Sequence, residues 1–161
     1  MRAIEINPAD CAISGGKREG KMAGKILLEV VTPEKQLLSQ EVDEVIAPGS
    51  EGEFGVLPGH CHFLSTLKIG ELRYRVNNQI HHMAVLWGYA EVTPTKVTVM
   101  AEVAEKAEDI DVDRAAAKVE EAERRVQAGG LPSEVKEAQI SLEKARLRKK
   151  IAERAHKTGH A

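Results

Sequence analysis

The sequence predicts a β-sandwich followed by an antiparallel hairpin of two helices, because its apolar residues change period once along the chain. From residue 25 to residue 103 the chain reads with period two, as where Leu72, Tyr74 and Val76 alternate with the charged residues at 71, 73 and 75. Such alternation is typical of strands with one buried face. Turn residues, among them Pro58-Gly59 and Asn77-Asn78, separate the strands at short intervals. Many short strands at this spacing favour a compact antiparallel sandwich or barrel.

A helical period replaces the alternation in the last third of the chain. Apolar residues recur every three or four positions over residues 112–126 and again over 135–151, which predicts two amphipathic helices. The break Gly129-Gly130-Leu131-Pro132 is short enough to join them as an antiparallel hairpin. Residues suited to cap the two helix starts are Asp109 or Asp111 and Ser133.

These patterns divide the chain into three segments. Residues 22–106 are expected to form the β-sandwich domain, and residues 107–161 the helical hairpin. Residues 1–21 carry charges of both signs and no long apolar core, so they match neither a secretory signal nor a mitochondrial presequence. We expect a disordered extension there, or a start assigned too far upstream with Met22 as the working start.

The composition excludes several functional classes. The 161 residues include 23 basic and 25 acidic residues, a net charge of −2, which argues against binding nucleic acid or a membrane surface through bulk charge. Two Phe, two Tyr and one Trp offer few platforms for stacking bases. Two cysteines are too few for a disulfide scaffold, and no apolar run is long enough to cross a bilayer. We therefore expect a soluble protein of a reducing compartment.

Catalytic and metal-binding motifs are sparse. The sequence lacks the Gly-x-Ser-x-Gly, Cys-x-x-Cys and His-Glu-x-x-His patterns. His60 and His62 could share one face of a strand, but a zinc site normally needs three or four convergent ligands, so ordinary surface histidines are the favoured interpretation. The carboxylates of Glu51 and Glu53 have no obvious nucleophile nearby. The sequence therefore predicts neither a metal site nor an enzyme.

Positive charge is concentrated near the C-terminus. Residues 144–157 hold seven Lys and Arg residues against one acid, Glu153, a local charge of +6. A solvated helix face is the ordinary interpretation of such a run. A more specific interpretation is a patch that binds an acidic surface of another protein. Nucleic-acid binding is disfavoured by the scarcity of aromatic residues and by the overall acidity.

The apolar stripe of the two helices is mostly alanine. Each buried Val or Leu contributes only about 1.5–3 kcal/mol, and conformational entropy opposes docking, so we expect the hairpin to dock marginally. Two interpretations stay open. The hairpin is either a bistable element that opens as a switch or a helix pair that merely supports the sandwich.

Two stretches resemble the epsilon subunit of the bacterial F-type ATP synthase. One is GSEGEFGVLPGH at residues 49–60, and the other is AVLWGYAEV at residues 84–92, followed by KVTVMAE. The resemblance extends in the same order from about residue 26 to 155 and includes a two-helix tail. Local departures are Cys61-His62, where the family often has Ala-Pro, and Trp87-Gly88-Tyr89 in place of a Gly-Gly-Phe-like turn. The break between the helices also differs from the polar linker expected.

The resemblance implies a ten-stranded sandwich and a helical hairpin in a rotor subunit that has no active site of its own. The subunit would couple proton or sodium translocation through the c-ring to ATP synthesis. Its implied partners are the gamma subunit, the c-ring and, transiently, the catalytic hexamer of alpha and beta subunits, with no nucleic acid. Its implied location is the bacterial inner membrane, peripheral on the cytoplasmic side. Residues expected at the c-ring or gamma contact are Ser50, Glu51, Glu53 and His60.

In this family the helical tail inhibits ATP hydrolysis when it extends along gamma into the hexamer. The resemblance therefore gives the basic run a partner, an acidic segment of a beta subunit. The residues expected at that inhibitory contact are Arg146, Arg148, Lys149 and Lys150.

An ATP-sensing regulatory module is the alternative function. Some members bind ATP through a motif to which the run IDVDRA at residues 110–115 is similar, and the resemblance implies ATP as a regulatory ligand and no required cofactor. Glu121 falls at a position of that site where it would repel phosphate. The competing interpretation of the motif is a capped helix start with an intrahelical ion pair. The residues of the implied ATP site are Ile110, Asp111, Arg114, Ala115, Lys144 and Arg148.

Overall fold

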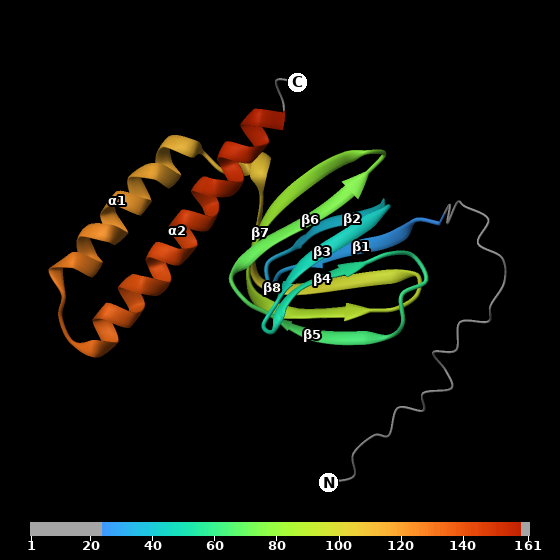
Figure 1. Cartoon of the computed structure of the whole chain (residues 1–161), viewed down its shortest axis with the longest axis horizontal. Helices are drawn as coiled ribbons and strands as arrows, with labels where there is room; N and C mark the ends of the chain where they lie inside the picture. The colour runs from blue at the N-terminus through green and yellow to red at the C-terminus, as the bar shows by residue number, and fades with distance from the viewer. Residues whose placement is uncertain (1–23, 159–161) are drawn as a thin grey trace, which may run out of the picture.

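The computed structural model describes residues 24–158, in which a β-domain is followed by a helical hairpin at one side of it (Figure 1). The expected extension 1–21 and the start at Met22 lie outside the described residues. The strands are β1 (Ile26–Val31), β2 (Gln36–Val42), β3 (Glu44–Gly49), β4 (Gly52–Val56), β5 (Phe63–Leu67), β6 (Gly70–Val76), β7 (Gln79–Val92) and β8 (Lys96–Lys106). The short 3-10 helix η2 (Ala107–Asp109) leads into α1 (Val112–Ala128) and α2 (Pro132–Thr158).

All eight described strands are hydrogen-bonded into one sheet that folds over itself. Its main path runs β2-β1-β8-β7-β5-β3-β4, and β6 bridges β3 and β7. The pairs are antiparallel except β1 with β8, which is parallel over residues 27–31 of β1. This parallel pair departs from the antiparallel sandwich that the alternation predicts, because β8, the last strand in the sequence, lies beside β1, the first, and runs in the same direction.

The number of strands depends on how the long strand β7 is counted. Its residues 79–85 pair with β6, and its residues 88–92 pair with β5, so β7 belongs to both halves of the domain. The change of partner falls at Trp87 and Gly88, whose φ angles are 51° and 142°. The resemblance implies ten strands, whereas the described residues form eight. The continuity of β7 from one half to the other accounts for one strand of this difference.

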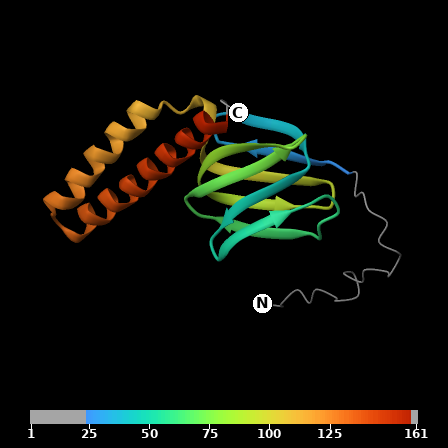
Figure 2. The ribbon, with the colours of Figure 1, turned by 45° about the horizontal axis from the view of Figure 1, so that its top comes forward.

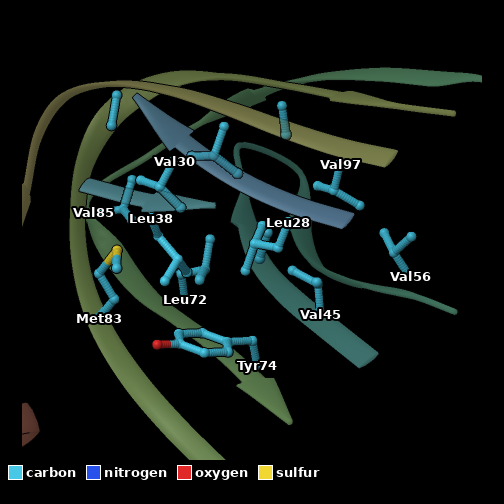
Figure 3. Packing of buried hydrophobic residues seen from close by; sticks show 14 of the residues in the cluster. Leu28, Val30, Leu38, Val45, Val56, Leu72, Tyr74, Met83, Val85 and Val97 are labelled. Carbon is cyan, nitrogen blue, oxygen red and sulfur yellow. The ribbon is translucent and has the colours of Figure 1, made fainter. Parts of the chain in front are cut away.

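One apolar core fills the sandwich. Inward-facing residues come from all eight strands, and several of the largest are fully buried (Figure 3). In β1 the burial alternates along the strand as the sequence predicts, with Ile26, Leu28 and Val30 inside. The largest fully buried side chains of this core are Ile26, Leu28, Leu72, Met83, Val30, Val42, Val45, Val56, Val85 and Val92.

The two helices pack against each other as an antiparallel hairpin (Figures 1 and 2). Asp111 caps α1, since its Oδ1 accepts a hydrogen bond from the backbone N–H of Arg114 at 2.8 Å. The predicted cap at Ser133 is wrong, because α2 already begins at Pro132, a residue whose fixed φ favours the first helical position. Instead, the Glu134 side chain accepts from the backbone N–H of Leu131 at 2.9 Å.

A second, smaller apolar cluster joins the hairpin to the sandwich. Near the C-terminal end of α2, Ile151 and Ala152 are fully buried against residues of β7 and η2. Half of the buried members are alanines, and those that α1 and α2 contribute are Ala115 and Ala152 beside Ile151. The buried residues of the cluster are Ile69, Ala84, Leu86, Ala107, Ile110, Ala115, Ile151 and Ala152. The loop between the helices lies at the far end of the hairpin, away from the sandwich (Figure 2).

Candidate functional site

A cavity of about 600 Å³ lies where η2 and the start of α1 face α2, a volume within the roughly 300–1,000 Å³ range of small-molecule sites. All six residues predicted for an ATP site line it: Ile110, Asp111, Arg114, Ala115, Lys144 and Arg148. The first four come from one short segment, and the last two come from α2, which the hairpin folds back beside it. The fold therefore gathers residues that are about thirty positions apart in the sequence.

Two of the predicted cations in this cavity already have partners in the β-domain. Arg148 forms a bidentate pair with Glu105 of β8, at 2.8 Å from Nε and 2.7 Å from Nη2. The hydrogen bond to Glu105 raises the pKa of the Arg148 guanidinium, although burial opposes it. The Nζ of Lys144 lies 4.3 Å from the centre of the Trp87 ring, a cation–π contact. An anion in the cavity would have to share or displace these partners.

Acidic side chains also line the cavity. Glu121 lines it, and its Oε2 accepts a hydrogen bond from Lys118 at 2.7 Å. That hydrogen bond lowers the pKa of the Glu121 carboxyl, so the side chain stays ionised at neutral pH. The basic residues of the lining are Arg114, Lys118, Arg125, Lys144 and Arg148, and the acidic ones are Glu105, Asp109, Asp111 and Glu121. The lining is thus nearly balanced in charge.

The basic residues predicted to contact a beta subunit all lie near acids of this chain. Arg146 pairs with Glu123 of α1 at 2.8 Å, and Lys149 lies 4.0 Å from Glu153 on α2 itself. Lys150 lies 4.0 Å from Glu71 of β6, and Arg148 pairs with Glu105 as described above. In the docked hairpin each of these four basic residues therefore has an acidic group of this chain within 4.0 Å.

The predicted ring-contact residues fall at two ends of β4. Ser50 and Glu51 form the exposed turn of the β3–β4 hairpin. The Ser50 hydroxyl lies 2.7 Å from that of Thr66 at the end of β5. Glu53 pairs with Arg73 of β6 at 2.6 Å and keeps about half of its side chain exposed. His60 lies beyond the other end of β4, so the four residues do not form one cluster.

Exposed apolar residues occupy the outer face of β5, β7 and β8. Tyr89 and Met100 are directly paired across β7 and β8, with exposed fractions of 54% and 44%. Thr66 of β5 is the partner of Tyr89 on its other side, and Leu64 lies two residues further along β5 with 68% exposed. Because Thr66 also touches Ser50, this outer face continues into the acidic turn. We call Leu64, Tyr89 and Met100 the apolar row.

One buried carboxylate was not anticipated from the sequence. Glu71 of β6 is only 6% exposed, and its oxygens lie 2.6 Å from His82 Nδ1 and 2.6 Å from Arg154 Nη1. Burial by itself raises the pKa of the Glu71 carboxyl, but the hydrogen bonds from His82 and Arg154 outweigh it and hold the pKa below the ordinary 4.5. No sequence signal set Glu71 apart, because in the alternating run Gly70–Val76 it lies on the polar side together with Arg73 and Arg75.

Within residues 24–158 the structure groups no three His, Cys, Asp or Glu side chains as a metal ion would require. Cys61 is a free, exposed thiol beside His60. Among the described helices there is none whose length and hydropathy would let it cross a membrane.

Comparison with known proteins identifies the class and then the family. Residues 25–107 match the family described as "ATP synthase, Delta/Epsilon chain, beta-sandwich domain", so the β-domain is of the delta/epsilon class. The chain is 54% identical over 133 residues to the ATP synthase epsilon chain of Syntrophobacter fumaroxidans, covering 83% of this chain and 99% of that protein. It is 51% identical over 137 residues to that of Citrifermentans bemidjiense, covering 83% and 98%. The chain belongs to the ATP synthase epsilon chains.

Solved structures share the fold at lower identity. A chain of the Euglena gracilis mitochondrial ATP synthase, in a structure of its OSCP, F1 and c-ring, superposes with a TM-score of 0.69 at 22% identity, over 89% of this chain and 92% of that one. A chain of the Tetrahymena thermophila enzyme, from its central stalk and c-ring, gives 0.57 at 16% identity, over 80% and 96%. Family membership confirms that the chain is a structural and regulatory subunit of its complex and not a catalytic one.

Proposed function

We propose that the chain works in the central stalk of the ATP synthase, where it binds the gamma subunit and the c-ring and couples proton or sodium translocation to ATP synthesis. Its place is peripheral, on the cytoplasmic side of the bacterial inner membrane. Support comes from its family and from the two structural neighbours, which come from assemblies that contain the c-ring and, for the Tetrahymena enzyme, the central stalk.

The observation that carries this proposal is the apolar row on the outer face of β5, β7 and β8. Three large side chains that stay exposed on one rigid sheet face form the kind of patch that marks a protein interface. The partner that we propose for the apolar row is the gamma subunit. The turn at Ser50 and Glu51, joined to this face through Thr66, offers carboxylate and hydroxyl acceptors to basic or amide groups of the ring loops. Glu53 extends that acidic surface along β4.

Affinity purification of the tagged chain from membranes tests this function. The wild-type chain brings down gamma and the catalytic subunits. Tyr89→Asp combined with Met100→Asp puts two charges into the apolar row and abolishes recovery of gamma. Ile80→Asp is the matched control, because Ile80 is 52% exposed on the other half of β7. Recovery of gamma by the double variant would reject the apolar row as its binding surface.

The helical hairpin is the inhibitory part of this subunit. In the docked arrangement its basic residues face acids of this chain, so inhibition exchanges these acids for those of a beta subunit. Enzyme reconstituted with a chain lacking residues 110–161 is expected to hydrolyse ATP faster while coupling survives. The same change is expected from replacing Arg146, Lys149 and Lys150 by Gln in the full-length chain. Unchanged hydrolysis in both would remove the inhibitory role.

ATP sensing is a second candidate function, favoured because one cavity gathers all six predicted residues. Arg114 would neutralise a phosphate there, while Lys144 and Arg148 would have to leave Trp87 and Glu105 in part. Calorimetric titration of the isolated chain with ATP tests it, with Arg114→Ala as the variant expected to lose the heat signal. No heat at millimolar nucleotide would reject this role.

A further inference from the structure

The contact between α2 and the sandwich includes two carboxylates that hold cations of the helix. Glu71 on β6 receives Arg154 at 2.6 Å, and Lys150 lies 4.0 Å from the same carboxylate. His82 of β7 holds its other oxygen at 2.6 Å. The contact with His82 therefore holds the Glu71 carboxylate within the sheet, and Arg154 reaches it from α2 with 42% of its side chain exposed.

The second carboxylate contacts α2 six residues nearer to the N-terminus of the helix. Glu105, near the end of β8, binds Arg148 through both of its oxygens, at 2.8 and 2.7 Å. Bidentate pairs of this kind are the stronger and more directional class of ion pair. Arg148 and Arg154 are six residues apart, so the two ion pairs hold a segment of α2 longer than one helical turn against the sandwich.

The apolar seam beneath these pairs is small. Four of its eight buried residues are alanine. From α2 only Ile151 is a large and fully buried side chain, while Ile140 and Leu147 of the same helix pack against the seam partly buried. Apolar burial is proportional to the area removed from water, so alanines contribute little. The ion pairs therefore account for a larger share of the docking free energy here than in a helix docked through leucines.

We propose that Glu71 and Glu105 form a carboxylate latch, which holds α2 on the sandwich through Arg154 and Arg148 and sets how often the hairpin is released. The latch is specific to the docked state, since neither pair survives when α2 leaves. A stronger anionic partner for Arg148 competes directly with Glu105. Salt weakens the latch because both cations are partly exposed. This inference concerns the isolated chain and is independent of whether the hairpin inhibits hydrolysis.

The one tryptophan of the chain reports the docked state without a label. Trp87 is partly buried against the seam, and Lys144 of α2 lies over its ring at 4.3 Å. When α2 leaves, the ring becomes accessible to acrylamide. Quenching of Trp87 fluorescence in the full-length chain therefore measures the open fraction, and its increase with sodium chloride measures the ionic contribution.

The decisive variant is Glu71→Gln with Glu105→Gln. It is expected to raise the open fraction about tenfold at low salt, the size of effect expected from losing charged hydrogen bonds. It should also remove most of the salt dependence. Glu44→Gln is the matched control, because it breaks the Glu44–Arg75 ion pair of 2.8 Å within the sandwich and leaves α2 untouched. Circular dichroism checks that each variant keeps its helices and strands.

Charge reversal keeps the test conclusive where Glu71→Gln impairs folding. Glu105→Lys alone and Arg148→Glu alone should each increase quenching, and the two together should restore it toward the wild-type value. Wild-type quenching in the double Gln variant would overturn the latch. So would a charge-reversed pair that stays as open as its single variants.

Discussion

Glu71 carries a negative charge at a site where burial alone would make the charge unfavourable. The hydrogen bonds from His82 and Arg154 reverse that preference and place the pKa of its carboxyl below 4.5 in the folded protein. A group whose pKa is lower in the folded than in the unfolded state stabilises the fold above its unfolded pKa. That stabilisation is lost as the pH falls through the folded value.

The pH dependence of unfolding tests this account of Glu71. We expect wild type to exceed Glu71→Gln in free energy of unfolding at neutral pH. The difference between the two proteins should shrink as the pH falls below about 4.5, the ordinary pKa of the group. Urea unfolding of both proteins over the range from neutral pH to about pH 3 measures it. A difference that stays constant across this range would contradict the assignment.

Gly88 lets the strand β7 run through both halves of the sandwich. Its φ of 142° belongs to a region that L residues rarely adopt, and a Cβ there would collide with the carbonyl oxygen of Met100 on β8. Gly88→Ala therefore combines backbone strain with a clash against neighbouring backbone. We expect a loss of roughly 3 kcal/mol in the free energy of unfolding, measured by urea denaturation.

Gly55 on β4 supplies the control for that prediction. A Cβ at Gly55 meets nothing within 4 Å, so Gly55→Ala should change stability by less than about 0.5 kcal/mol. Equal stabilities for the Gly88 and Gly55 variants would show that β7 tolerates a side chain where it changes partner.

The elements that the sequence predicts well are those whose signal is local. Alternation in β8 predicts both the strand and its buried face, where Val97, Val99 and Ala101 lie inside, and the Gly129–Pro132 break predicts where the helices separate. The continuity of β7 was not predictable, because Trp87-Gly88 has the composition of a turn and only the pairing with β5, β6 and β8 keeps it in the sheet. The cap at Ser133 failed because Pro132 already fits the first helical position.

In the candidate cavity, too, the sequence predicts which nearby residues come together but not their contacts with distant parts of the chain. Residues 110–115 lie together because they are consecutive, and Lys144 and Arg148 join them through the hairpin geometry that helical periodicity implies. Their partners come from the β-domain. Glu105 is 43 positions from Arg148, and Trp87 is 57 positions from Lys144. No pattern in the sequence fixes how a helix docks on a sheet, so these contacts required the structure.

The whole molecule joins two parts of unequal packing. The sandwich buries many large aliphatic residues in one core, whereas the buried positions between α1 and α2 are mainly alanines, such as Ala115, Ala122, Ala138 and Ala145. Less apolar area is buried per helix residue, and local stability varies accordingly within one chain. The hairpin is therefore the part expected to open first.

Hydrogen exchange measured by mass spectrometry on the full-length chain tests this inequality. Amides of α1 and α2 should exchange faster than those of the central strands β1, β7 and β8, because the helices open without unfolding the sandwich. Within α2 the slowest exchange should lie around Ile151, which is fully buried in the seam. The control is the same measurement with Ile151→Ala, which should speed exchange across the C-terminal half of α2 and leave β1 unchanged. Helices as protected as β1 would mean that sandwich and hairpin unfold as one unit, and a releasable arm would then have no structural basis.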